Sequence, residues 1–65
     1  MTVSEFKKLT KAAGLTSQRE VAEFLDISLR TAHGYFNDVA IPTTIALLLR
    51  AMHKTGLSAD DVRAL

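Results

Sequence analysis

The sequence predicts an all-α fold, a compact bundle of about five short helices. Apolar residues recur at the three- and four-residue spacing of helices along most of the chain. Residues that favour helix starts, mainly Ser and Thr, precede these stretches, and Gly14 and Gly56 stand where helices are expected to end. At 65 residues the chain is expected to form a single domain, 1–65, around one small core.

The composition excludes several kinds of chemistry. The chain has no cysteine, which excludes disulfides, thiol nucleophiles and Cys-based zinc sites. A chain this short buries only about 60% of its unfolded surface, which leaves little room for a deep catalytic cavity. No nucleophile–base set or Gly-rich phosphate loop is present, and His33 and His53 fall on different predicted helices. We therefore expect no enzymatic activity, no metal and no cofactor.

Charge and hydropathy limit the partners. The net charge is +1, from 8 basic and 7 acidic residues. This balance argues against a protein that binds nucleic acid through its total charge, because such domains are usually far more basic. The sequence has no signal-peptide pattern and no apolar stretch of the roughly 20 residues needed to span a bilayer. We expect a cytoplasmic protein with no membrane contact and no small-molecule ligand.

The first helix is expected to begin near Thr2. Thr2 and Glu5 have the spacing of a capping box, in which each side chain hydrogen-bonds the backbone N–H of the other residue. Phe6 and Leu9 lead its inward face, and Gly14 suits the left-handed position just after a helix end.

A very short segment separates the second and third helices. Ser17 with Glu20 predicts a second capping box, and this helix has to end at Asp26, a residue that tolerates left-handed backbone. Ser28 then begins a third helix of about two turns. Because so short a connection makes two helices cross steeply, residues 17–37 predict a helix-turn-helix.

Two further helices are expected in the second half of the chain. Pro42 is placed in the first turn of the fourth helix, where its missing N–H costs nothing. Gly56 ends that helix, and Ser58 with Asp61 predicts a capping box for a short fifth helix. The inward stripe of the fourth helix is expected to consist of Ile45, Leu48, Leu49 and Met52.

The fourth helix is apolar beyond the width of one face. One explanation is a self-complementary patch within residues 42–65 that joins two copies of the chain. The other is a central core helix, apolar nearly all round. The residues assigned to a homodimer interface are Leu47, Ala51, Leu57, Val62 and Leu65.

Two stretches carry a resemblance to a known family. Residues 41–50 read Ile-Pro-Thr-Thr-Ile-Ala-Leu-Leu-Leu-Arg, and residues 17–36 contain, at characteristic spacing, Ser17, Gln18, Ala22, Leu25, Ser28 and Thr31. On these residues the chain resembles the lambda-repressor and Cro-like helix-turn-helix regulators, also called XRE-type. Three residues depart from the family pattern: Asp26 replaces the turn glycine, Ala32 replaces a branched core residue, and Gly34 lies inside the third helix.

The resemblance implies a sequence-specific DNA-binding regulator. It would be a repressor or autorepressor of phage or mobile-element type that binds an inverted-repeat operator in double-stranded DNA as a homodimer. The third helix would then lie in the major groove. The alternative is a helical protein-interaction module, or an antitoxin, whose main partner is a protein.

The start of the third helix provides the expected base contacts. Arg30 can hold guanine O6 and N7 together, which is worth about 1–3 kcal/mol of discrimination; its other interpretation is a solvated surface arginine. Leu29 is expected to contact a thymine methyl, or else to pack at the end of a short helix. His33 could donate to a base or a phosphate. Gly34 would let the helix backbone approach the groove closely, or else marks a short helix that becomes ordered only on DNA.

Other residues are expected at the DNA backbone. The resemblance implies a backbone role for Gln18, and Lys7, Lys8 or Lys11 could add phosphate contacts. Tyr35 is expected mainly to pack, with a phosphate contact by its hydroxyl. The complete set of predicted DNA-binding residues is Gln18, Arg19, Ser28, Leu29, Arg30, Thr31, His33, Gly34, Tyr35 and Asn37.

Overall fold

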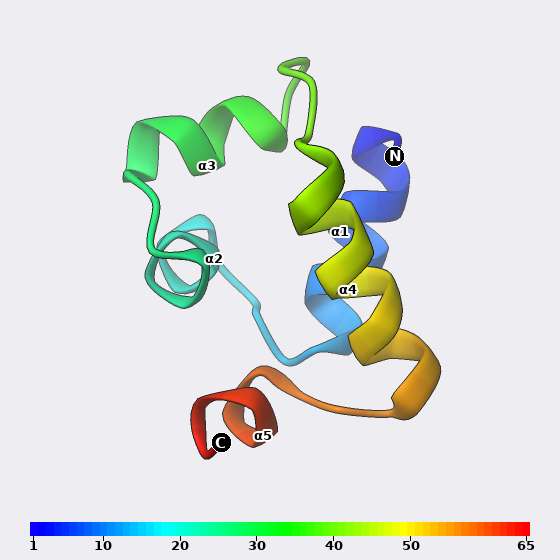
Figure 1. The fold of residues 1–65 in the computed structure, drawn as a ribbon. Helices are drawn as coiled ribbons and strands as arrows, with labels where there is room; N and C mark the ends of the chain where they lie inside the picture. Colours follow the sequence, from blue (N-terminus) through cyan, green and yellow to red (C-terminus); the bar gives the residue numbers. More distant parts are fainter.

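The computed structural model describes residues 1–65 and contains five helices and no strand, which confirms the all-α fold class. In Figure 1, α1 and α4 lie side by side, α2 packs against α3, and α5 lies at the opposite end of the molecule from α3. No helix combines the length and apolar composition needed to cross a membrane. The helices are α1 (Val3–Ala12), α2 (Gln18–Leu25), α3 (Leu29–Tyr35), α4 (Thr43–Thr55) and α5 (Ala59–Arg63).

The core is centred on Phe6 of α1. Its side chain is completely buried, and its ring meets the rings of Tyr35 and Phe36 edge to face, with centroid distances of 5.9 and 5.0 Å. Leu49 of α4 and Val21 of α2 complete the innermost layer. The first four helices, α1 to α4, therefore share one set of apolar contacts, as the helical spacing of the apolar residues predicted.

One buried position is polar. Thr10 of α1 is 1% exposed, although the apolar spacing gave no reason to expect it inside. Its hydroxyl donates to the backbone carbonyl of Phe6 at 2.9 Å, one turn earlier in the helix. A hydroxyl that bonds within its own helix can be buried at little cost, because no polar atom is left without a partner.

Four of the five helix starts are capped at the predicted residues, but only one capping box is complete. Thr2, Ser17, Ser28 and Ser58 each accept the N–H of the residue three positions later. Only the Ser58–Asp61 pair also bonds in the reverse direction. The two boxes predicted at Thr2–Glu5 and Ser17–Glu20 are therefore wrong in their second half, because other groups occupy the two glutamate side chains.

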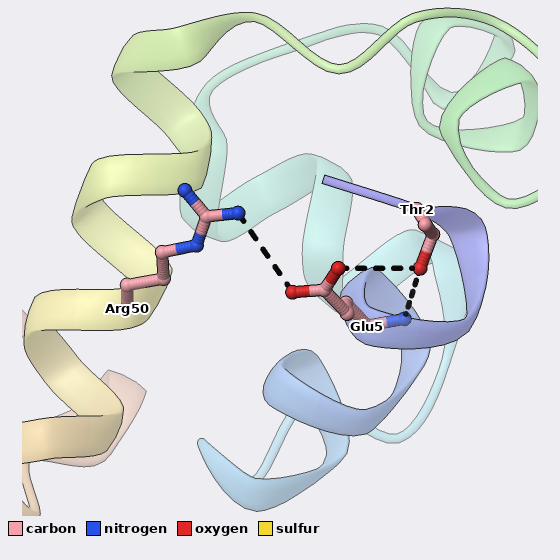
Figure 2. A network of polar contacts seen from close by, with 3 residues as sticks. All are labelled: Thr2, Glu5 and Arg50. Atoms are coloured by element: carbon pink, nitrogen blue, oxygen red, sulfur yellow. Dashed lines mark hydrogen bonds and ion pairs between the residues drawn. The ribbon is translucent and has the colours of Figure 1, made fainter.

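The carboxylate of Glu5 is drawn toward α4. Figure 2 shows it between the Thr2 hydroxyl, at 3.5 Å, and the guanidinium of Arg50, at 3.7 Å. Both partners of this ion pair are about half exposed, so it adds little stability. Its consequence is that Glu5 and Arg50 offset each other's charge on the α1–α4 side of the molecule.

The fourth helix differs from prediction in two respects. Pro42 is the N-cap residue rather than the first helical residue, because its ψ of 143° is extended, and α4 begins at Thr43. Leu48 was expected inside but is 37% exposed, whereas Ala46 is buried. The buried stripe is centred on Leu49, and Leu48 lies about 100° around the helix from Leu49, at its margin.

The short turn between α2 and α3 rests on a left-handed residue. Asp26 has φ 55° and ψ 47°, the conformation that the sequence required there, and it is the one non-glycine residue with positive φ. The Ile27 N–H then bonds the carbonyl of Ala22 at 3.0 Å. This pattern ends α2 and reverses the chain within residues 26–28, so that Ser28 can begin α3 at once.

Gly34 has a different role from the predicted one. Its carbonyl accepts the N–H groups of Asn37, Asp38 and Val39 at 3.0–3.1 Å, which folds the chain back at the end of α3. A β-carbon at this position would lie 2.9 Å from Cγ2 of Val39. The absent side chain therefore makes room for the chain's own Val39, and the prediction of a glycine that faces a DNA groove is wrong.

We expect Gly34→Ala to destabilise the protein, despite a gain in helix propensity of about 1 kcal/mol, because crowding of this kind costs about 1–3 kcal/mol. In a Val39→Ala background, which removes Cγ2 and leaves only the β-carbon at 3.3 Å, the same change should destabilise the protein less. Urea unfolding of the four proteins in this double-mutant cycle measures the coupling. Equal effects of Gly34→Ala in both backgrounds would contradict the contact.

Candidate nucleic-acid interface

The helices α2 and α3 form a crossed pair that presents one face of α3. In Figure 1, α2 is seen nearly end-on while α3 runs across the view, so their axes cross steeply. The inward face of α3 is formed by Ala32, Tyr35 and Phe36, which are buried or half-buried. The opposite face is left to solvent along the full length of this seven-residue helix.

The exposed face of α3 begins with the two residues predicted to contact bases. Leu29 is 49% exposed and does not belong to the core, so the packing interpretation of this residue is wrong. Arg30 is exposed, and no carboxylate pairs with it. A half-exposed leucine beside an unpaired guanidinium gives this surface both an apolar contact and a set of hydrogen-bond donors.

Ser28 and Thr31 form hydrogen bonds with each other. The Ser28 hydroxyl accepts the Thr31 N–H at 3.0 Å, and the two side-chain oxygens lie 2.8 Å apart. Both residues are exposed. They fix the first turn of α3 and therefore the direction in which Leu29 and Arg30 project.

A hydrogen-bonded bridge joins the start of α2 to the end of α3. His33 Nδ1 lies 3.1 Å from Gln18 Oε1, and His33 Nε2 lies 3.2 Å from Asn37 Nδ2. Asn37 Nδ2 also donates to the backbone carbonyl of His33 at 2.7 Å. Three of the predicted DNA-binding residues thus contact one another, and both ring nitrogens of His33 are engaged within the chain.

Two other predicted contact residues are not available as predicted. Tyr35 is 7% exposed, and its ring packs on Phe6, which agrees with its expected packing role but turns the ring away from the exposed face of α3. Gly34 is half-buried beneath Val39. Arg19, by contrast, is exposed on α2 and has no ion-pair partner.

The structure separates the three lysines of α1. Lys7 and Lys11 line a hollow of about 410 Å³ together with Ser17 and Gln18 at the start of α2, and with Phe36 at the end of α3. No acidic residue lines this hollow. Lys8 instead lines a separate groove with Glu5, Arg50 and His53. The four-residue spacing of Lys7 and Lys11 indicated a shared face, but nothing in the sequence showed that α2 begins beside it.

The residues assigned to a dimer interface do not form one patch. Leu47 is 58% exposed and Ala51 is exposed one turn later on α4. Val62 of α5 packs against the core instead. Leu65 is 96% exposed but follows α5, at the far end of the molecule from the start of α4 (Figure 1). Leu57 is 41% exposed, just after the end of α4.

Hydrogen bonds near two helix starts hold two carboxyl groups in their charged form. The Thr16 hydroxyl, 2.7 Å from Glu20 Oε1, lowers the pKa of Glu20 below its ordinary value of 4.5. Hydrogen bonds from the Ser58 backbone and hydroxyl likewise lower the pKa of Asp61 below 3.8. Both carboxylates are thus committed to the starts of α2 and α5.

Comparisons with protein-family models, curated proteins and solved structures gave no match for this chain. The assignment of a function therefore rests on the residues and geometry described above.

The hydrogen bond between Thr16 and Glu20 should make the stability of the fold depend on pH. Because the folded protein holds the pKa of Glu20 below 4.5, the unfolded chain binds this proton more readily. The stabilisation is therefore present above pH 4.5 and is lost as the pH falls through the lower, folded value. Thr16→Val removes the hydroxyl and should return the pKa of Glu20 toward its ordinary value.

Thermal unfolding from pH 6 to pH 3 measures this effect, together with an NMR titration of the Glu20 carboxyl. The variant should lose less of its stability over this range than the original chain does. Asp61 serves as an internal control, because its own cap is unchanged and its titration should stay where it is. Parallel stability profiles for the two proteins would contradict the assigned role of Thr16.

Proposed function

We propose that the protein is a sequence-specific DNA-binding regulator in which α2 and α3 form a helix-turn-helix and α3 enters the major groove. The observation that carries the proposal is the unpaired, exposed Arg30 beside the half-exposed Leu29 at the start of α3. Arg can read guanine in the major groove, and an apolar side chain can contact the methyl group of thymine.

The hollow lined by Lys7, Lys11 and Gln18 supports a contact between the protein and the DNA backbone. Lys7 and Lys11 bring positive charge to the side of the molecule where α2 begins, and no acidic residue lines the space between them. The N-terminus of α2 adds the partial positive charge of a helix start. A phosphate in this hollow would fix the position of α3 relative to the bases.

A homodimer is the second part of the proposal. The chain measures 28 Å along its longest axis, whereas major-groove half-sites on one face of DNA are about 34 Å apart, so a single copy spans only one of them. The exposed residues of α4, Leu47 and Leu48 with Ala51, provide an apolar face on which two copies could meet. The site read by such a dimer is an inverted repeat.

The regulatory role follows from the resemblance to lambda-repressor and Cro-like proteins. We propose that the dimer represses transcription by occupying its operator, as a repressor or autorepressor of phage or mobile-element type. The binding face is small and the total charge is low, so we place the discrimination in a few base contacts and in the spacing of the two copies.

Selection from a random DNA pool tests the proposal. The chain should enrich a motif made of two inverted half-sites. Arg30→Ala should then lower the preference for one base pair in each half-site by about 1–3 kcal/mol, because the guanidinium recognises that base alone. Absence of any enriched motif would defeat the DNA-binding proposal and favour a protein partner.

The lysines of α1 supply a matched control for this experiment. Lys11→Ala should weaken binding to selected and unrelated duplexes alike. It should also make the slope of log affinity against log salt shallower by about 0.9 for each phosphate that is no longer neutralised. Lys8→Ala removes the same charge from the separate groove that Lys8 lines with Glu5 and Arg50, and should change neither quantity appreciably. Equal effects of the two changes would mean that only total charge matters.

The dimer is tested by Leu47→Glu, which places a charge on the exposed face of α4. Sedimentation should show a monomer where the original chain forms a dimer, and DNA binding should weaken because two half-sites are no longer bound together. Leu65→Glu is the matched control at the far end of the molecule and should still dimerise. A monomeric original chain, both alone and on its operator, would refute the dimer.

A further inference from the structure

The bridge between α2 and α3 determines which atoms of its three side chains are donors. Asn37 Nδ2 lies 2.7 Å from the backbone carbonyl of His33, which can only accept, so this end of the Asn37 side chain is its NH2 group. The same NH2 group lies 3.2 Å from His33 Nε2, which must therefore accept as well. The proton of the neutral imidazole is then on Nδ1.

The position of this proton orients Gln18 in turn. His33 Nδ1–H can donate only to an acceptor, and the Gln18 atom 3.1 Å away is accordingly Oε1. The NH2 group of Gln18 is directed away from the ring and makes no hydrogen bond within the chain. Gln18 lines the hollow that contains Lys7 and Lys11. A hydrogen-bond donor from a residue that lines the same hollow as two lysines suits an anionic acceptor such as a phosphate oxygen.

We propose that His33 is a positioning residue that acts through Gln18. Asn37 fixes the ring and its tautomer, the ring fixes the amide of Gln18, and the amide presents its NH2 group to a backbone phosphate of DNA. This inference rests on the proposed DNA-binding function and replaces the direct contact with a base or a phosphate predicted for His33. The two NH2 hydrogens of Asn37 are both used by His33, so Asn37 also acts through the ring.

We call this series of contacts, from Asn37 through His33 to Gln18, the relay. It explains why three residues from two helices should behave as one unit. Without His33, the Gln18 side chain regains its rotamer freedom and its NH2 group is no longer directed at the phosphate. Without Gln18, the orientation of the His33 ring has no further effect on the phosphate. The contributions of the two residues to DNA affinity are therefore shared rather than additive.

A double-mutant cycle tests the relay on the duplex obtained by selection and on a scrambled duplex of the same length. Gln18→Ala should weaken binding to both by about tenfold, the size expected of a hydrogen bond to a charged group. His33→Ala should weaken both by a similar factor. The double variant should bind within about twofold of Gln18→Ala alone, whereas independent contacts would give about a hundredfold loss.

Two controls separate positioning from a general loss of structure. His33→Gln retains a donor and an acceptor and should recover part of the affinity, while His33→Leu should not; the unfolding free energies of these variants show whether folding is intact. The ¹⁵N shifts of the imidazoles above pH 8 should show the Nδ1–H tautomer for His33. His53, whose ring makes no hydrogen bond within the chain, is the internal reference.

The outcomes distinguish this inference from the proposed function. An Nε2–H tautomer, additive losses, or no recovery by His33→Gln while DNA binding is intact would overturn the relay alone. An original chain that binds neither duplex would overturn the DNA-binding function, and with it the phosphate as the target of Gln18, even if the Nδ1–H tautomer were found.

Discussion

The burial of Phe6 is the constraint on which the exposed face of α3 depends. A seven-residue helix is too short to be stable alone, so tertiary contacts have to hold it. Phe6 provides part of them through its edge-to-face contacts with Tyr35 and Phe36, at the end of α3, and the packing of α2 against α3 provides the rest. These contacts hold the end of α3 on its inward side, and Leu29 and Arg30 lie exposed on the opposite side. The core and the candidate interface are therefore two sides of the same short helix.

Local chemistry explains which parts of the fold could be predicted. Caps at Ser17 and Ser28, and the left-handed Asp26 between them, depend on neighbours a few residues away, and the structure has them where the sequence indicated. The errors arose where a distant residue decides the outcome. Glu5 is drawn to Arg50 rather than to the N–H of Thr2, and the space beside Gly34 is filled by a loop residue whose position no local pattern reveals. Local signals fix where helices begin and end, but not which group finally satisfies a side chain.

The candidate interface was predictable to a similar extent. Helical period alone places Leu29, Arg30, His33 and Asn37 on one outward face, because the apolar residues of α3 occupy the other. The contact between His33 and Gln18 spans 15 residues and requires the crossing of α2 and α3, which spacing cannot supply. The distinction between Lys11 and Lys8 has the same origin: it depends on which element packs beside each face of α1.

The arrangement of charge shows how a chain with a net charge of +1 can still present a cationic surface. Four of its acidic side chains are engaged at helix starts or in ion pairs: Glu5 with Arg50, Asp60 with Arg63, Glu20 with Thr16 and Asp61 with Ser58. The ion pairs also lie away from α3, on the α1–α4 side and on α5. The lining of the hollow beside Gln18 includes two lysines and no carboxylate, although Glu20, which keeps its charge, bonds to Thr16, one of the lining residues. Total charge sets the strength of long-range attraction to DNA, whereas this separation sets where a phosphate can be held, and the second quantity is the one the fold controls.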